Sequence, residues 1–117
     1  MMHPGKEACD LADRECAPCR GGTEPLKGAA LDRWAAKLGV GWQVVDGHHL
    51  AKSFAFPDFR QALAFTQQVG ELAERVGHHP TIELSWGSVA IRVWTHKIDG
   101  LAEADFVFAS KVDRLAR

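Results

Sequence analysis

The sequence predicts an α+β fold in which a four-stranded antiparallel sheet carries three helices packed on one face. The predicted order is helix, two strands, helix, two strands, helix. Three segments repeat apolar residues at intervals of three or four, as on the buried face of a helix. Between them lie two pairs of short apolar runs, each pair separated by a glycine-containing turn that is typical of a β-hairpin.

The first predicted helix follows Thr23, a residue suited to an N-cap, and ends at Gly39 and Gly41. Its apolar positions recur at helical spacing: Leu26, Ala30, Leu31, Trp34, Ala35 and Leu38. Residues 42–47 and 49–56 then read as two strands around the Asp46-Gly47 turn signal.

The second predicted helix opens at Pro57-Asp58, with Asp58 as the cap and Gln61 three residues later. Gly77 occupies the position where a helix ends in a left-handed residue. The apolar stripe is expected to pack in the core, against another subunit, or both, and comprises Ala62, Phe65, Val69, Leu72 and Val76.

Residues 81–96 alternate apolar and polar side chains on both sides of Gly87-Ser88, which suits a type II′ turn. With that turn, paired residues have numbers that sum to 175, and Glu83 faces Arg92. The apolar pairs on one face are Ile82 with Val93, Leu84 with Ile91, and Trp86 with Val89. From about residue 102, a third helix is predicted by the spacing of Ala102, Phe106, Ala109, Val112 and Leu115.

Length and charge limit the kinds of protein that this sequence can encode. The 117 residues suit one small domain, predicted over residues 23–117 after a flexible leader at 1–22. The net charge of −1 does not favour nucleic acid or an anionic membrane as a partner. No apolar run approaches a membrane span, and the N-terminus carries charges where a secretory signal needs an apolar stretch. We therefore expect a cytoplasmic protein.

The leader contains all three cysteines, Cys9, Cys16 and Cys19. With His3 they supply the residue types of a four-ligand zinc set, but only one C-x-x-C knuckle is present. The alternative, free thiols in a flexible polar leader, is the preferred interpretation, and no metal is expected.

Four of the six histidines form adjacent pairs. The predicted register places His79 opposite His96, with Cβ atoms about 4.5–5.5 Å apart. His78 follows the end of the second helix, where the dipole favours a charged imidazole. Three imidazoles would thus form an acid–base site, with a zinc site as the competing functional interpretation and solvated polar residues as the non-functional one. The other pair, His48-His49, lies in the first hairpin turn and is expected to be solvated.

The spacing of Glu74, His78-His79-Pro80, Trp86, His96 and Asp105 resembles the signature of the pterin-4a-carbinolamine dehydratases, and the likeness is dense over residues 57–113. Trp86 replaces the tyrosine often found in the family, and Ala102 replaces a threonine or serine.

The resemblance implies a cofactor-free hydro-lyase that removes water from a 4a-hydroxytetrahydropterin. It implies catalytic roles for His78, His79, His96 and Asp105, with acid and base unassigned. Asp105 would orient His96 or act only as a helix-start acid, and Trp86 would pack under the site. The residues implied in substrate binding are Glu74, Pro80, Thr95, Lys97 and Ile98.

The same resemblance implies a role in recycling the tetrahydropterin of an aromatic amino acid hydroxylase. It also implies a homodimer formed through sheet edges or a homotetramer formed through the middle helix, for which Phe65, Val69 and Leu72 are compatible. The alternatives are a pterin-binding protein of molybdopterin metabolism and a non-enzymatic dimerisation partner on the same fold.

Overall fold

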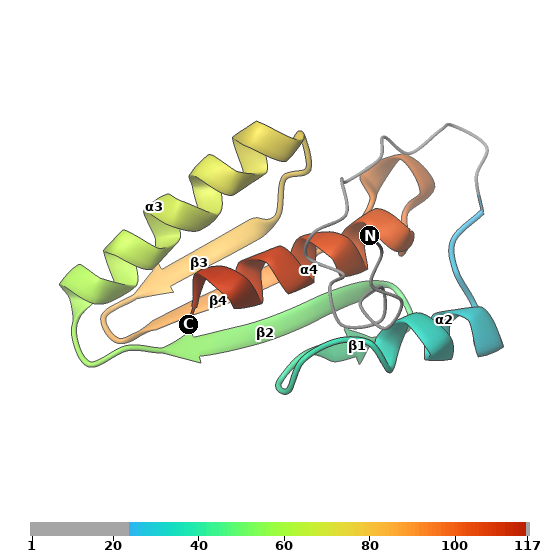
Figure 1. Cartoon of the computed structure of the whole chain (residues 1–117), viewed down its shortest axis with the longest axis horizontal. Coiled ribbons are helices and arrows are strands. Elements are labelled where there is room, and N and C mark those ends of the chain that lie inside the picture. Colours follow the sequence, from blue (N-terminus) through green and yellow to red (C-terminus); the bar gives the residue numbers. More distant parts are fainter. Residues whose placement is uncertain (1–23, 117) are drawn as a thin grey trace, which may run out of the picture.

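The computed structural model describes residues 24–116 and has the predicted order of helices and strands (Figure 1). The predicted leader, with the cysteines and His3, lies outside the described residues. The elements are α2 (Gly28–Ala35), β1 (Gln43–Val45), β2 (His49–Ala55), α3 (Phe59–Val76), β3 (Thr81–Ser85), β4 (Ser88–Val93), the 3₁₀ helix η2 (His96–Ile98) and α4 (Glu103–Leu115).

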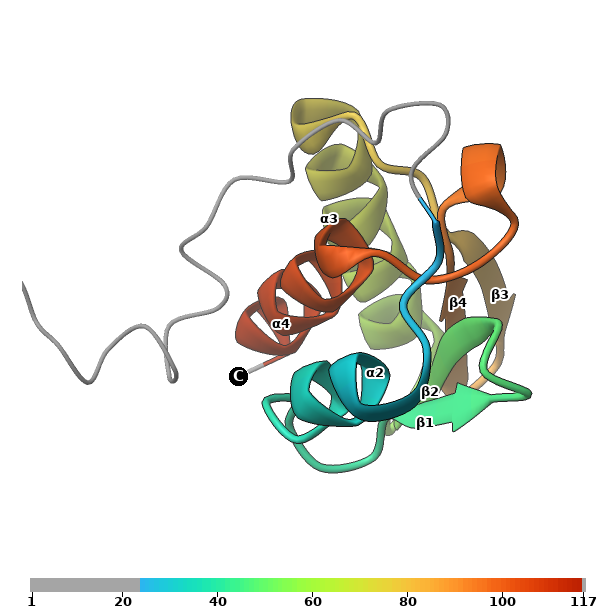
Figure 2. The same cartoon turned by 90° about the vertical axis from the view of Figure 1, so that its right-hand side faces the viewer.

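The four strands form one antiparallel sheet in the order β1-β2-β4-β3. Figure 2 shows α2, α3 and α4 on the same side of this sheet, as predicted. No helix between residues 24 and 116 is both long enough and apolar enough to cross a membrane.

Helix α3 begins and ends where the sequence predicts. The Asp58 carboxylate accepts a hydrogen bond from the Gln61 backbone N–H at 2.8 Å, and Gly77 ends the helix with φ 72°. Its predicted stripe is buried at Phe65, Val69 and Leu72. These three side chains therefore belong to the core and do not form the contact between subunits with which the sequence was compatible.

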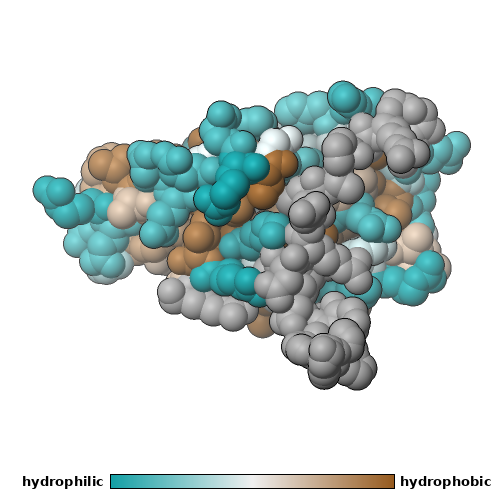
Figure 3. Space-filling view, turned by 45° about the horizontal axis from the view of Figure 1, so that its top comes forward, coloured by the Kyte–Doolittle hydropathy of each residue, from teal (hydrophilic) through white to brown (hydrophobic). Residues whose placement is uncertain are grey.

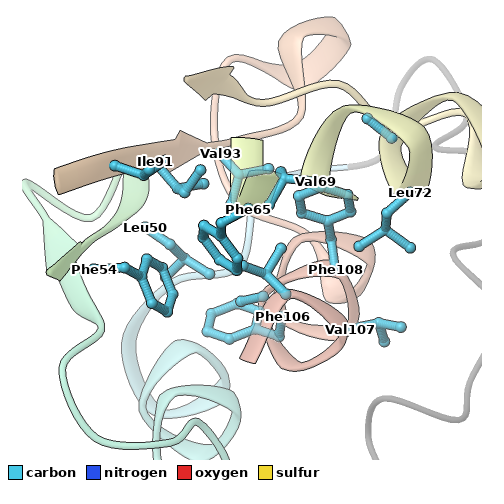
Figure 4. Packing of buried hydrophobic residues seen from close by; sticks show 14 of the residues in the cluster. Leu50, Phe54, Phe65, Val69, Leu72, Ile91, Val93, Phe106, Val107 and Phe108 are labelled. Atoms are coloured by element: carbon cyan, nitrogen blue, oxygen red, sulfur yellow. The ribbon is translucent and has the colours of Figure 1, made fainter. Parts of the chain in front are cut away.

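The core lies between the sheet and the two longer helices. Figure 4 shows Phe65 of α3 directed toward β2 and α4, and its ring centroid is 4.8 Å from that of Phe54. Helix α4 is buried almost all round in its first half, from Ala104 to Ala109. On the face shown in Figure 3, hydrophilic residues lie between small apolar areas.

The first predicted helix is too long at its start. Helix α2 begins at Gly28, with Lys27 as its N-cap. Leu26 lies in an extended segment, and its backbone N–H donates to the Leu101 carbonyl at 2.8 Å. This long-range pairing removes Leu26 from the helix, although its spacing fits the apolar repeat.

The first hairpin turns at Asp46-Gly47 as predicted, with positive φ at both residues and a hydrogen bond from His48 N–H to the Val45 carbonyl at 2.8 Å.

The predicted register of the second hairpin is wrong by two residues. Ser85 pairs with Ser88, so the turn is Trp86-Gly87 and paired numbers sum to 173. Glu83 faces Ala90 and reaches Arg92 only diagonally, at 3.8 Å. A shift of two keeps the same residues on each face, so alternation alone does not distinguish the registers.

The corrected register changes two site predictions. Trp86 lies in the turn with 69% of its surface exposed, so it does not pack under a site. Strand β4 ends at Val93, and His96 falls in η2, while His79 precedes β3. His79 and His96 are therefore not opposed on the ladder.

Gly70 within α3 and Gly77 at its C-cap predict opposite stability effects. A Cβ at Gly70 meets nothing within 4 Å, so Gly70→Ala should raise the free energy of unfolding by about 0.5–1 kcal/mol. Gly77→Ala should lower it by about 1 kcal/mol, because position 77 is left-handed. Urea unfolding of both variants gives the comparison, and equal signs would contradict the assigned end of α3.

Candidate functional site

The carboxylate of Asp105 connects three parts of the chain. Asp105 is fully buried at the start of α4. Its Oδ2 accepts hydrogen bonds from the Thr95 hydroxyl at 2.7 Å and from the Ala102 backbone N–H at 2.9 Å. Its Oδ1 lies 2.6 Å from Nε2 of His78. One carboxylate thus joins the end of α3, the segment after β4 and the first turn of α4.

The contact with Asp105 fixes the orientation of the His78 ring. A carboxylate only accepts, so Nε2 of His78 carries the hydrogen and Nδ1 is the nitrogen left to bind or release a proton. The His78 side chain is 14% exposed and lies 5.7 Å from the Phe108 ring, measured between centroids. The sequence assigned this carboxylate to His96 or to helix capping alone; it contacts His78 and also caps α4.

His79 turns toward solvent, in contrast to its neighbour. Its Nε2 lies 2.7 Å from Oε2 of Glu74, and both side chains are mostly exposed. Glu74 therefore contacts an imidazole, a contact that the sequence did not predict, and Pro80 follows half-buried. An exposed pair of this kind contributes little to stability.

His96 begins a short loop that closes on itself. The Thr95 N–H donates to the Gly100 carbonyl at 2.8 Å, and the Gly100 N–H returns to the Thr95 carbonyl. Lys97 is exposed and Ile98 half-buried within the loop, and Asp99 ends η2 in the left-handed region. The ring of His96 lies 4.6 Å from that of Trp94.

The first histidine pair is not the solvated turn that the sequence predicts. His48 and His49 are half-buried, and their rings lie 5.2 and 5.7 Å from Trp94, the indole that His96 also contacts. Nε2 of His48 lies 2.8 Å from Oδ1 of Asp99. Because positions 48 and 99 meet only through the tertiary fold, no local pattern in the sequence could have found this contact.

The histidines gather at one end of the molecule. In both Figure 1 and Figure 2 the connection from α3 to β3, which carries His78 and His79, lies at the same end as the loop that carries His96. Thr95 links the two, because it precedes His96 and donates to the carboxylate that holds His78. Among residues 24–116 no group of three or more His, Cys, Asp or Glu side chains is arranged to hold a metal ion.

These features define a class of protein: a small α+β domain in which a buried carboxylate holds an imidazole. Residues 24–115 match the family model described as pterin 4 alpha carbinolamine dehydratase. The chain therefore belongs to this family.

Relatives agree over nearly their whole length. A protein of Rubrobacter xylanophilus, named as a candidate pterin-4-alpha-carbinolamine dehydratase, is 60% identical over 91% of this chain and 98% of its own. A protein of Alkaliphilus metalliredigens with the same name is 50% identical over 90% of this chain and 95% of its own.

Two solved structures share the fold, each with 32% sequence identity. A transcriptional coactivator/pterin dehydratase from Brucella melitensis superposes with a TM-score of 0.74, covering 80% of this chain and all of that one. A pterin dehydratase-like protein described as a RuBisCO assembly factor in the alpha-carboxysome superposes with a TM-score of 0.56, covering 65% of this chain and 89% of that one.

Replacing Asp105 should destabilise the fold. Asp105→Asn introduces two amide hydrogens where the carboxylate accepted bonds, so one or two buried donors lose their acceptor. The free energy of unfolding should fall by about 1–3 kcal/mol. Glu103→Gln, an exposed carboxylate in the same helical turn, should change it by less than about 0.5 kcal/mol. A similar decrease in the free energy of unfolding in both variants would show that the buried contacts of Asp105 do not account for the loss.

Burial lowers the pKa of His49 below its ordinary value of 6.5; the charges of His48 and Arg92 lower it further, and Asp46 partly opposes them. As pH falls below about 6.5, the unfolded chain therefore protonates His49 before the folded chain does, and stability decreases. His49→Gln should flatten the fall in unfolding free energy between about pH 7 and pH 5. Urea unfolding across this range measures the slope, and parallel curves for the two proteins would contradict the lowered pKa.

Proposed function

We propose that this protein dehydrates a 4a-hydroxytetrahydropterin to the quinonoid dihydropterin by histidine acid–base catalysis. The observation that carries the proposal is the contact between His78 and the buried carboxylate of Asp105, in a chain that belongs to the pterin 4 alpha carbinolamine dehydratase family. A carboxylate that fixes the tautomer and orientation of an imidazole is a common device of acid–base sites.

The reaction requires two proton transfers and no change of oxidation state. The substrate loses the proton on N5 to a base, while an acid protonates the hydroxyl on C4a, which leaves as water. The C4a–O bond breaks, and a double bond forms between C4a and N5. Imidazoles suit both steps because they bind and release protons near neutral pH.

The geometry favours different duties for the three histidines. We assign His78 a proton transfer through Nδ1, because its Nε2 is engaged by Asp105. His79 and His96 are exposed, so they can approach the substrate from solvent-facing positions.

Four of the five residues expected to bind substrate keep that role in the proposal: Glu74, Pro80, Lys97 and Ile98. Thr95 differs, because its hydroxyl is buried and donates to Asp105. We assign Thr95 the positioning of that carboxylate, so its effect on substrate would be indirect.

The proposed product would be reduced and reused by an aromatic amino acid hydroxylase, in the cytoplasm. We also propose a homo-oligomer formed through a sheet edge. Strand β3 is at the edge of the sheet and pairs only with β4 among the described residues. An unpaired edge is a template for a strand of a second copy. Phe65, Val69 and Leu72 of α3 lie in the core, so they no longer support a tetramer formed through this helix.

Other roles compete with this proposal. The solved relatives are named for transcriptional coactivation and RuBisCO assembly as well as for pterin chemistry, and those roles concern protein partners. A pterin-binding protein of molybdopterin metabolism is a further alternative. The presence of His79 and His96 in addition to the imidazole held by Asp105 favours the enzyme, because a scaffold that binds a partner protein does not require three acid–base groups.

The test follows the absorbance of a 4a-hydroxytetrahydropterin, generated in situ, as it dehydrates with and without the protein. The intact protein should accelerate dehydration, with or without EDTA. Replacing His78, His79 or His96 by glutamine should reduce the acceleration by about 10²-fold or more. Glu74→Gln should weaken substrate binding, whereas Glu71→Gln, an exposed carboxylate in the preceding turn of α3, should not.

If the intact protein does not accelerate dehydration, the proposed dehydratase activity is contradicted for this pterin. Acceleration that survives all three histidine substitutions would contradict the acid–base site while leaving the activity in place. Circular dichroism spectra of each variant distinguish loss of activity from loss of fold.

A further inference from the structure

The first histidine pair makes specific contacts that the proposed reaction does not use. His48 contacts three groups: its Nε2 lies 2.8 Å from Oδ1 of Asp99, its Nδ1 lies 3.1 Å from Nδ1 of His49, and its ring lies 5.2 Å from that of Trp94. A histidine in a hairpin turn is ordinarily surrounded by water. These contacts instead attach the turn to the loop that contains His96.

Two routes lead from His48 to His96. The first passes through Asp99, which ends η2 and whose backbone N–H donates to the His96 carbonyl at 3.2 Å. The second passes through Trp94, which His48 and His49 contact with their rings and against which the His96 ring lies at 4.6 Å. His48 is therefore connected both to the backbone of the loop and to the indole against which the His96 ring lies.

The hydrogen bond between His48 and Asp99 has a defined donor and acceptor. The Asp99 carboxylate accepts, so Nε2 of His48 carries a hydrogen and points to the loop. Asp99 is 86% exposed and His48 33% exposed, so the pair contributes little to overall stability. The contact can affect the rate in another way, by setting the position of the loop. A group displaced by about 1 Å from its reacting geometry can lose about 10²-fold in rate.

We propose that His48 is a positioning residue that holds the η2 loop, and with it His96, through its contacts with Asp99 and Trp94. This inference rests on the proposed function, in which His96 exchanges a proton with the substrate. His48 itself does not touch the reacting atoms in this proposal.

The chain offers a matched pair of substitutions to test the Asp99 route. Asp46 and Asp99 are both exposed aspartates in the left-handed region, with φ of 54° and 50°. Glycine accepts that backbone conformation at either position. Asp99→Gly removes the partner of His48, whereas Asp46→Gly removes a carboxylate from the same hairpin turn without touching that contact.

The kinetic measurement compares Asp99→Gly, His48→Ala, the double variant and Asp46→Gly in the dehydration assay. Asp99→Gly and His48→Ala should each lower kcat about tenfold, because they misplace an acid–base group. KM should rise by a smaller factor, because Lys97 and Ile98 of the same loop also bind substrate in this proposal. The double variant should lose no more than His48→Ala alone, since both remove the same support. Asp46→Gly should keep the kcat of the intact protein.

A second measurement does not depend on activity. In NMR spectra, the His96 imidazole signals and the amide signals of residues 97–100 should shift in Asp99→Gly and in His48→Ala, and should keep their positions in Asp46→Gly. His48→Gln retains a donor toward Asp99 and should restore part of the original signals and of kcat.

The outcomes separate the two claims. If the intact protein has no dehydratase activity but the NMR shifts appear as expected, the proposed function fails while the contact of His48 with the loop stands. If the intact protein is active and neither His48→Ala nor Asp99→Gly changes kcat, the positioning role is overturned. Kinetic losses that multiply in the double variant would also overturn it, because they would show that the two residues act separately.

Discussion

The buried carboxylate of Asp105 is the constraint on which the rest of the site depends. Removing a carboxylate from water is costly unless hydrogen-bond donors replace the lost solvent. Three donors do so here: the His78 ring, the Thr95 hydroxyl and the Ala102 backbone N–H. They come from three separate segments, so the carboxylate is satisfied only when α3, β4 and α4 are correctly assembled.

The same carboxylate serves both the fold and the proposed site. It caps α4 in place of the side-chain oxygen that Ala102 lacks, because it occupies the third position of the helix and accepts from the N-cap backbone. It also fixes the tautomer of His78. A substitution at position 105 therefore affects more than the His78 ring, since the start of a helix whose first half is buried would lose its cap.

The sequence predicts the elements of this fold better than the contacts between them. Local chemistry determines α3, where Asp58 and Gly77 act within one turn of the ends they define. The register of the second hairpin eluded prediction because a shift of two residues leaves every side chain on its original face. Close approach adds the missing information: a Cβ at Gly87 would lie 3.1 Å from the Phe56 carbonyl oxygen, a contact that only the folded chain contains.

The histidines show the same limit and what it means for the site. Spacing identifies His78, His79 and His96 through the family resemblance, but their partners come from the tertiary fold: Asp105 for the first, Glu74 for the second and Trp94 for the third. The partner of His78 is buried and serves a helix, so it tolerates little change. The partner of His79 is exposed and that of His96 is half-buried, and the latter, Trp94, also contacts the rings of His48 and His49. The fold thus holds one of the three proposed proton carriers by a buried contact and the other two by contacts nearer the surface.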